Sequence, residues 1–119
     1  MNNTLILCLK KPSVNKIGKL INIMRSEILN DKQREVLYIT QEECAEVTQA
    51  ISKIFRFGFD MRYPVDGDSN REKLMEEVGD LVAMIRLMID FNIIDMDGLE
   101  QAAEEKMKKL KRWSNLYDE

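Results

Sequence analysis

An all-α fold, built as one four-helix bundle, is predicted by three features of this 119-residue sequence. Only five glycines and two prolines interrupt the chain, which favours long helices over strands and turns. Apolar residues recur at alternating steps of three and four, the spacing of one helix face. Two pairs, Ser69 with Glu72 and Asp97 with Glu100, have the spacing of a capping box, which marks a helix start. Short connections between four helices predict a bundle.

The predicted elements follow in order along a single domain, residues 1–119. Four helices are expected, over residues 13–27 (or to 29), 32–57, 69–91 and 97–113. Gly58 ends the second helix, and residues 58–69 form the one substantial loop. Residues 4–9 fit either a short strand or an irregular packed arm. We therefore expect an N-terminal arm with the first helix in residues 1–30, and a core in residues 32–113.

Charge and hydropathy limit the classes of partner. The net charge is −3 and the sequence pI is about 5.1. This argues against a nucleic-acid binder with a broad basic face, because neutralising phosphates needs clustered Lys and Arg. The apolar run at residues 5–9 is too short for a signal-peptide core, and no stretch approaches a membrane span. We expect a cytoplasmic protein that binds neither nucleic acid nor membrane.

The chain has no histidine, which excludes several kinds of active site. Ser-His-Asp triads, Cys-His pairs, HExxH zinc sites and ferritin-type di-iron sites all need that residue. Cys8 and Cys44 lie far apart without CxxC spacing, so both are expected to be free thiols. Acid–base or metal chemistry must therefore use carboxylates, lysines, tyrosines or these thiols.

Two acidic pairs interrupt the apolar faces of the second and third predicted helices. On a wheel of 100° per residue, Glu43 lies within about 20° of Val36, and Glu46 continues the same seam. The apolar residues of this predicted inner face are Val36, Ile39, Val47, Ala50, Ile54 and Phe57. On the third helix, Glu77 lies on the apolar line and Asp80 lies one step toward its rim. The apolar residues of that predicted inner face are Leu74, Val78, Leu81, Met84, Ile85 and Met88. Antiparallel packing of the two helices would bring both pairs to the same interface.

Carboxylates gathered in this way need partners. Two like charges 4 Å apart repel by about 4 kcal/mol at an effective dielectric constant near 20. The acids must therefore protonate, find basic partners or bind cations. Oxygen ligands without His or Cys favour Mg²⁺ or Mn²⁺. The adjacent Glu42 and Glu76 point outward and are expected to be ordinary solvated residues.

A second interpretation needs no metal. Glu43 and Glu77 could form an ionic network with basic residues, for which Arg25, Lys53 and Lys73 are the candidates. The protein would then be a non-catalytic helical interaction protein that binds no divalent cation. The inward placement of both acidic pairs on adjacent helices favours the metal.

Two stretches resemble a known family: EECAEVTQAISKIFRFG (42–58) and EKLMEEVGDLVAMIRLMID (72–90). They are similar to the MazG-type nucleotide pyrophosphohydrolases, which belong to the all-α NTP pyrophosphatases. The mark of that family is an EExxE helix, a variable loop, and an EExxD helix with Gly before the Asp. The resemblance covers about residues 32–113.

The resemblance implies a function for the four acids. Glu43, Glu46, Glu77 and Asp80 would be the ligands of Mg²⁺, with Mn²⁺ as a substitute, and Glu43 or Glu46 would also be the general base. The reaction would convert a ribo- or deoxynucleoside triphosphate into its monophosphate and pyrophosphate. The bundle would be completed in a homodimer or homotetramer, as is usual in that family.

Basic residues are the expected partners of the substrate phosphates. Lys53 lies seven residues beyond Glu46 on the same side of its helix, although a solvated lysine explains this position equally well. The basic segment 106–113 resembles the tail of many relatives, which implies that Lys109 and Arg112 contact the substrate. Cations at a helix C-terminus also complement the helix dipole, which is an alternative explanation for this segment.

Four aromatic residues could stack on a nucleobase: Phe55, Phe57, Phe59 and Trp113. Aromatic residues at helical spacing are more often part of a core, so we assign none of these four to the substrate.

Overall fold

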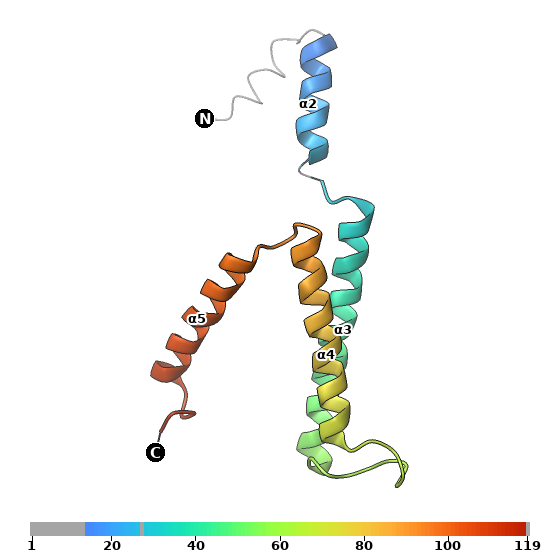
Figure 1. Cartoon of the computed structure of the whole chain (residues 1–119), viewed down its shortest axis with the longest axis vertical. Coiled ribbons are helices and arrows are strands. Elements are labelled where there is room, and N and C mark those ends of the chain that lie inside the picture. Colours follow the sequence, from blue (N-terminus) through green and yellow to red (C-terminus); the bar gives the residue numbers. More distant parts are fainter. Residues whose placement is uncertain (1–13, 27, 119) are drawn as a thin grey trace. The chain divides into compact units, whose positions relative to one another are not determined.

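A computed structural model describes residues 14–26 and 28–118, and for residues 14 and 22–26 the backbone alone. This part of the chain contains four helices: α2 (Val14–Ser26), α3 (Asp31–Phe57), α4 (Asn70–Asp90) and α5 (Met96–Trp113) (Figure 1). The predicted all-α class is therefore confirmed. Residues 4–9, left open between strand and arm, and Cys8 lie outside the described residues, whereas Cys44 is a free, exposed thiol.

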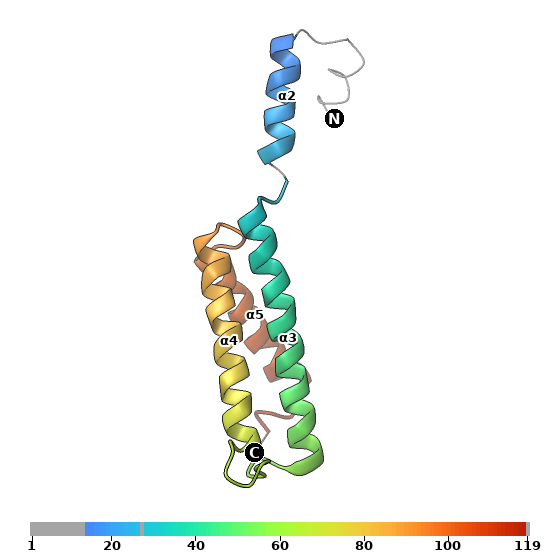
Figure 2. The same ribbon diagram turned by 90° about the vertical axis from the view of Figure 1, so that its right-hand side faces the viewer.

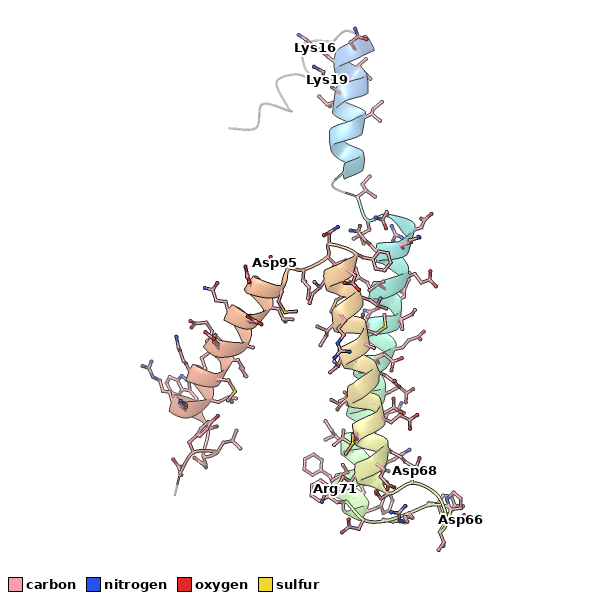
Figure 3. The ribbon with its side chains drawn as sticks, in the orientation of Figure 1. Lys16, Lys19, Asp66, Asp68, Arg71 and Asp95 are labelled. Atoms are coloured by element: carbon pink, nitrogen blue, oxygen red, sulfur yellow. The ribbon has the colours of Figure 1, made fainter. Side chains whose placement is uncertain are left out.

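The chain divides into two compact units, residues 1–31 and 32–119, and each is described by itself. The first unit contains α2, on which Lys16 and Lys19 are exposed (Figure 3). The second contains α3, α4 and α5. Among the helices of the described ranges, none has both the length and the apolar character needed to cross a bilayer.

The helices α3 and α4 form an antiparallel hairpin, in which the two lie side by side in both views (Figures 1 and 2). The most buried apolar side chains of the described residues are Val36 and Ala50 from α3 and Met84 from α4. All three positions belong to the predicted inner faces, so the seam between these helices follows the helical periodicity of the sequence.

Two positions at the edges of these faces were expected inside and are exposed instead. Phe57 is 53% exposed because it is the last residue of α3, where the hairpin opens into its loop. Val78 is 41% exposed because it lies about 100° from Glu77 around α4 and so reaches the side of the helix.

The start of α4 is fixed by the predicted capping box. Ser69 Oγ accepts from the Glu72 backbone N–H (3.1 Å), and the Ser69 backbone N–H donates to Glu72 Oε2 (2.7 Å). Arg62 Nη1 lies 3.0 Å from the same Glu72 oxygen. The Ser69 backbone N–H, followed by the Arg62 guanidinium, holds the pKa of Glu72 below its ordinary value of 4.5.

We expect a Glu72→Gln variant to melt below the wild type at pH 7. A carboxyl group whose pKa is lowered by folding stabilises the fold above its ordinary pKa, and this contribution is lost as the pH falls through the lowered value. The difference in melting temperature should therefore shrink as the pH falls below 4.5. Thermal melts across this range would test it, and a difference that is constant with pH would contradict it.

The loop between α3 and α4 is held to the start of α4 by backbone hydrogen bonds. Gly58, in the left-handed region (φ +81°), ends α3, and its carbonyl accepts from Asn70 Nδ2 at 3.0 Å. The backbone N–H groups of Asn70 and Arg71 donate to the carbonyls of Met61 (3.0 Å) and Phe59 (2.9 Å). The Arg71 guanidinium also lies over the Phe59 ring, at 4.2 Å from its centroid (Figure 3). Both ends of the loop are thus fixed to the hairpin.

The start of α5 differs from the predicted one by two residues. The N-cap is Asp95, not Asp97, because Asp95 Oδ1 accepts from the Gly98 backbone N–H at 2.7 Å. Asp97 lies inside the first turn, where its charge complements the helix dipole. No residue of α5 is buried.

Candidate functional site

Three of the four predicted metal ligands lie together where α3 faces α4. Glu43 comes from the middle of α3, and Glu77 and Asp80 come from the first half of α4. One carboxylate oxygen from each of the three residues lies within 4.8 Å of the others. Glu43 and Glu77 are half-buried and Asp80 is exposed. The hairpin thus brings the Glu77 and Asp80 pair of α4 together with Glu43, one member of the acidic pair on α3.

Glu46, the fourth predicted ligand, has a different position. It is exposed, one turn beyond Glu43 on α3, and it is not a member of the close trio among the described residues. It lines a small cavity of about 60 Å³ together with Glu77, Lys53 and Lys73. Glu46 therefore lies beside the trio and shares this cavity with one of its members, Glu77.

The acids of this cluster disfavour each other's charged forms. Partial burial, then the charges of Asp80, Glu46 and Glu42, raise the pKa of Glu43 above its ordinary value. Partial burial, then Glu46 and Asp80, likewise raise the pKa of Glu77. Both shifts arise first from partial burial of the carboxylates and then from the neighbouring negative charges.

Ionic partners for these acids are not found among the described side chains. Ion pairs within that set form between Arg62 and Glu72 and between Lys108 and Glu105, and nowhere else. Lys53 and Lys73 therefore do not pair with Glu43 or Glu77, although both lysines line the adjacent cavity. The side chain of Arg25, the third candidate partner, lies outside the described residues.

The chemistry of the trio fits a small hard cation. Its donors are all carboxylate oxygens, the type that Mg²⁺ and Mn²⁺ prefer. Ligands at 2.0–2.1 Å from Mg²⁺ lie at most about 4.2 Å apart. Oxygens within 4.8 Å of one another therefore need only small side-chain movements to share one ion.

The predicted phosphate-binding residues lie in two different places. Lys53 lines the cavity next to Glu46 and Glu77, as its spacing along α3 suggested. Lys109 and Arg112 lie on the exposed last turns of α5, and neither lines that cavity.

Four residues of the cavity were not predicted as site residues, namely Gln49, Ala50, Asn70 and Lys73. Lys73 lies four residues before Glu77, so its place on the same face of α4 was readable from the sequence. Asn70 is buried at the first position of α4, and its side chain donates to the Gly58 carbonyl. A lone Asn after a capping Ser gives no such signal.

None of the four aromatic residues that were left open between base stacking and the core is buried. Phe55 and Trp113 are 86% and 80% exposed, and Phe57 and Phe59 are about half exposed. The aromatic rings remain on the surface of the described part of the chain.

Comparison with known proteins gives one match. The model of the MazG nucleotide pyrophosphohydrolase domain matches residues 31–115. The match spans α3, α4 and α5 and includes all four candidate acids. Searches of curated proteins and of solved structures found no match.

Proposed function

The chain belongs to the MazG nucleotide pyrophosphohydrolase family, and on this premise we propose that it hydrolyses nucleoside triphosphates between the α and β phosphates. The products would be the nucleoside monophosphate and pyrophosphate, and the reaction would require Mg²⁺. The observation that best supports this proposal is the carboxylate trio of Glu43, Glu77 and Asp80, which has no basic partner among the described side chains. A cluster of carboxylates like this one suits Mg²⁺, which proteins usually bind through a few carboxylates together with the phosphates of a substrate.

Each acid then has a proposed role. Glu43, Glu77 and Asp80 would hold Mg²⁺, or Mn²⁺ in its place, and Glu46 would complete the ligand set. When bound, the ion would neutralise phosphate oxygens and acidify water. Glu46 is also the favoured general base, rather than Glu43, because it borders the cavity that the substrate would enter.

The cations would bind the polyphosphate. Lys53 and Lys73 line the cavity next to Glu46 and Glu77, so their amines would offset the charge that a triphosphate brings to these acids. Lys109 and Arg112, on the basic last turns of α5, are proposed as additional phosphate contacts.

Product analysis tests the reaction directly. Incubation with a panel of ribo- and deoxynucleoside triphosphates and Mg²⁺ should give monophosphate and pyrophosphate from at least one of them. Addition of a chelator should stop the reaction. Diphosphate with orthophosphate would place the cleavage elsewhere, and no product from any nucleotide would contradict the proposal.

We also propose that the protein works as a homodimer or homotetramer. Large apolar side chains are exposed throughout the second unit, including Met75 (68%), Trp113 (80%) and Leu116 (72%). Burying such surface against a second copy would compensate for the small core of the single chain. Sedimentation equilibrium should give at least twice the monomer mass of 13.9 kDa, and the melting temperature should fall on dilution. A monomer at micromolar concentration would contradict this.

A further inference from the structure

A second cavity lies directly beside the small cavity that Glu46 and Glu77 line. It has a volume of about 330 Å³ and is formed by the end of α3, the loop after it and the start of α4. The two cavities share three lining residues, Lys53, Asn70 and Lys73. The smaller cavity borders Glu46 and Glu77, whereas the larger one extends away from the acids toward the loop.

The two cavities differ in their chemistry. The larger cavity contains no acid, and three of its seven lining residues are aromatic or methionine: Phe57, Met61 and Tyr63. All three side chains are accessible, since Phe57 is 53%, Met61 43% and Tyr63 80% exposed. Accessible rings around a cavity offer a flat apolar surface to a planar ligand.

The wall between the cavities is cationic and held in position. Lys73 Nζ donates to the Tyr63 carbonyl at 3.1 Å, which connects the amine to the loop. Asn70 donates its side-chain N–H to the Gly58 carbonyl, and the Asn70 backbone N–H donates to the Met61 carbonyl. These bonds fix the loop on the hairpin, so the cavity exists without a ligand.

We propose that the larger cavity holds the nucleoside of the triphosphate, with its base against Phe57 and Tyr63. Lys53 and Lys73 then lie at the junction, where the phosphate attached to the nucleoside passes toward Glu46 and Glu77. Along the site, the acids come first, then the two lysines, then the aromatic rings. A metal-bound nucleotide has its parts in the same order: the metal would lie at the acids, the phosphates at the lysines and the base at the rings. This inference rests on the proposed function and assigns the substrate-recognition residues of that site.

Arg56 also lines the larger cavity, and its guanidinium lies 5.4 Å from the Phe57 ring centroid. With Lys53 and Lys73 it gives this cavity three cations, so a bare polyphosphate is the competing occupant. The two occupants differ in what the rings contribute. A nucleoside loses its stacking surface when a ring is removed, whereas a polyphosphate depends on the cations alone.

Binding of two probes to Phe57→Ala and Tyr63→Ala variants tests the proposal. The probes are an α,β-methylene deoxynucleoside triphosphate, which cannot be cleaved at the proposed bond, and inorganic tripolyphosphate. Calorimetry with Mg²⁺ should show each variant binding the nucleotide about 10- to 100-fold more weakly than the wild type, the range expected for one lost base–ring stack. Binding of tripolyphosphate should be unchanged.

Phe55→Ala is the matched control, because Phe55 is a similarly placed exposed ring on α3 that does not line the cavity. It should bind both probes like the wild type, and circular dichroism should show the same helical content in all variants. Unchanged nucleotide binding in both Phe57→Ala and Tyr63→Ala would overturn the proposal. An equal loss for both probes would also overturn it, by placing the polyphosphate there.

The wild type separates this inference from the proposed function. If the wild type neither binds the nucleotide nor releases pyrophosphate, both fail together. If it binds and hydrolyses nucleotides while the two ring variants behave like the wild type, only the nucleoside site fails.

Discussion

Glu77→Gln is expected to lower the rate of nucleoside triphosphate hydrolysis by about 10²- to 10³-fold, the loss typical of one preorganised electrostatic group in a transition state. Glutamine keeps the size of the side chain but removes the charge that a divalent cation needs. Glu77 is the one acid that belongs to the trio and also lines the cavity with Lys53 and Lys73. Its loss should therefore affect both metal and substrate. Pyrophosphate release under saturating nucleotide measures the effect.

The neighbouring residue provides a matched control. Glu76 is exposed and lies on the outer side of α4, so Glu76→Gln removes the same charge one position away from the site. It should keep close to wild-type activity. An active Glu77→Gln variant with normal helical content would remove Glu77 from the ligand set and would count against a metal held between α3 and α4.

The sequence was sufficient to predict the hairpin and the meeting of Glu43, Glu77 and Asp80, although it also placed Glu46 in that cluster. Helical periodicity placed Val36 and Met84 inside, and the capping box located the start of α4 at Ser69. Because Glu43 and Glu77 interrupt the same periodic faces, their meeting follows from antiparallel packing alone. Sequence patterns that are local, such as a capping box, or that repeat along one helix, such as an apolar face, therefore predict the structure of this hairpin.

Features that depend on the path of the chain between helices were not predictable in this way. Asp95 rather than Asp97 caps α5 because the turn after α4 brings Asp95 to the third amide of the helix, while both residues have suitable side chains. The cavity around Tyr63 depends on hydrogen bonds from Asn70 and Lys73 to loop carbonyls. Backbone carbonyls have no sequence signature, so the cavity itself could not be foreseen.

Removal of divalent metal is expected to lower the melting temperature of the wild type by roughly 10 °C. A ligand present at 100 times its dissociation constant stabilises a fold by about 2.7 kcal/mol, and each kcal/mol shifts the melting temperature of a domain of this size by about 4 °C. The effect is large here because Glu43, Glu77 and Asp80 lie close together without basic partners among the described side chains. Melting curves in Mg²⁺ and in a chelator measure it.

The double variant Glu43→Gln/Glu77→Gln should show no response to Mg²⁺, yet melt above the metal-free wild type at pH 7. Both carboxyl groups have a raised pKa, so the folded state binds their protons more tightly than the unfolded state does. Stability of the metal-free wild type should therefore fall as the pH rises from 4.5 through the raised values. The double variant lacks this dependence, and the two proteins should converge at lower pH.

Glu42→Gln/Glu76→Gln, which removes two exposed charges from the same two helices, should retain the full response to Mg²⁺. This comparison separates ion binding at the cluster from general screening of negative charge, since screening would affect both double variants alike. If Mg²⁺ stabilised both variants equally, the cation would act on the acidic surface as a whole. The cluster between α3 and α4 would then have no ion of its own.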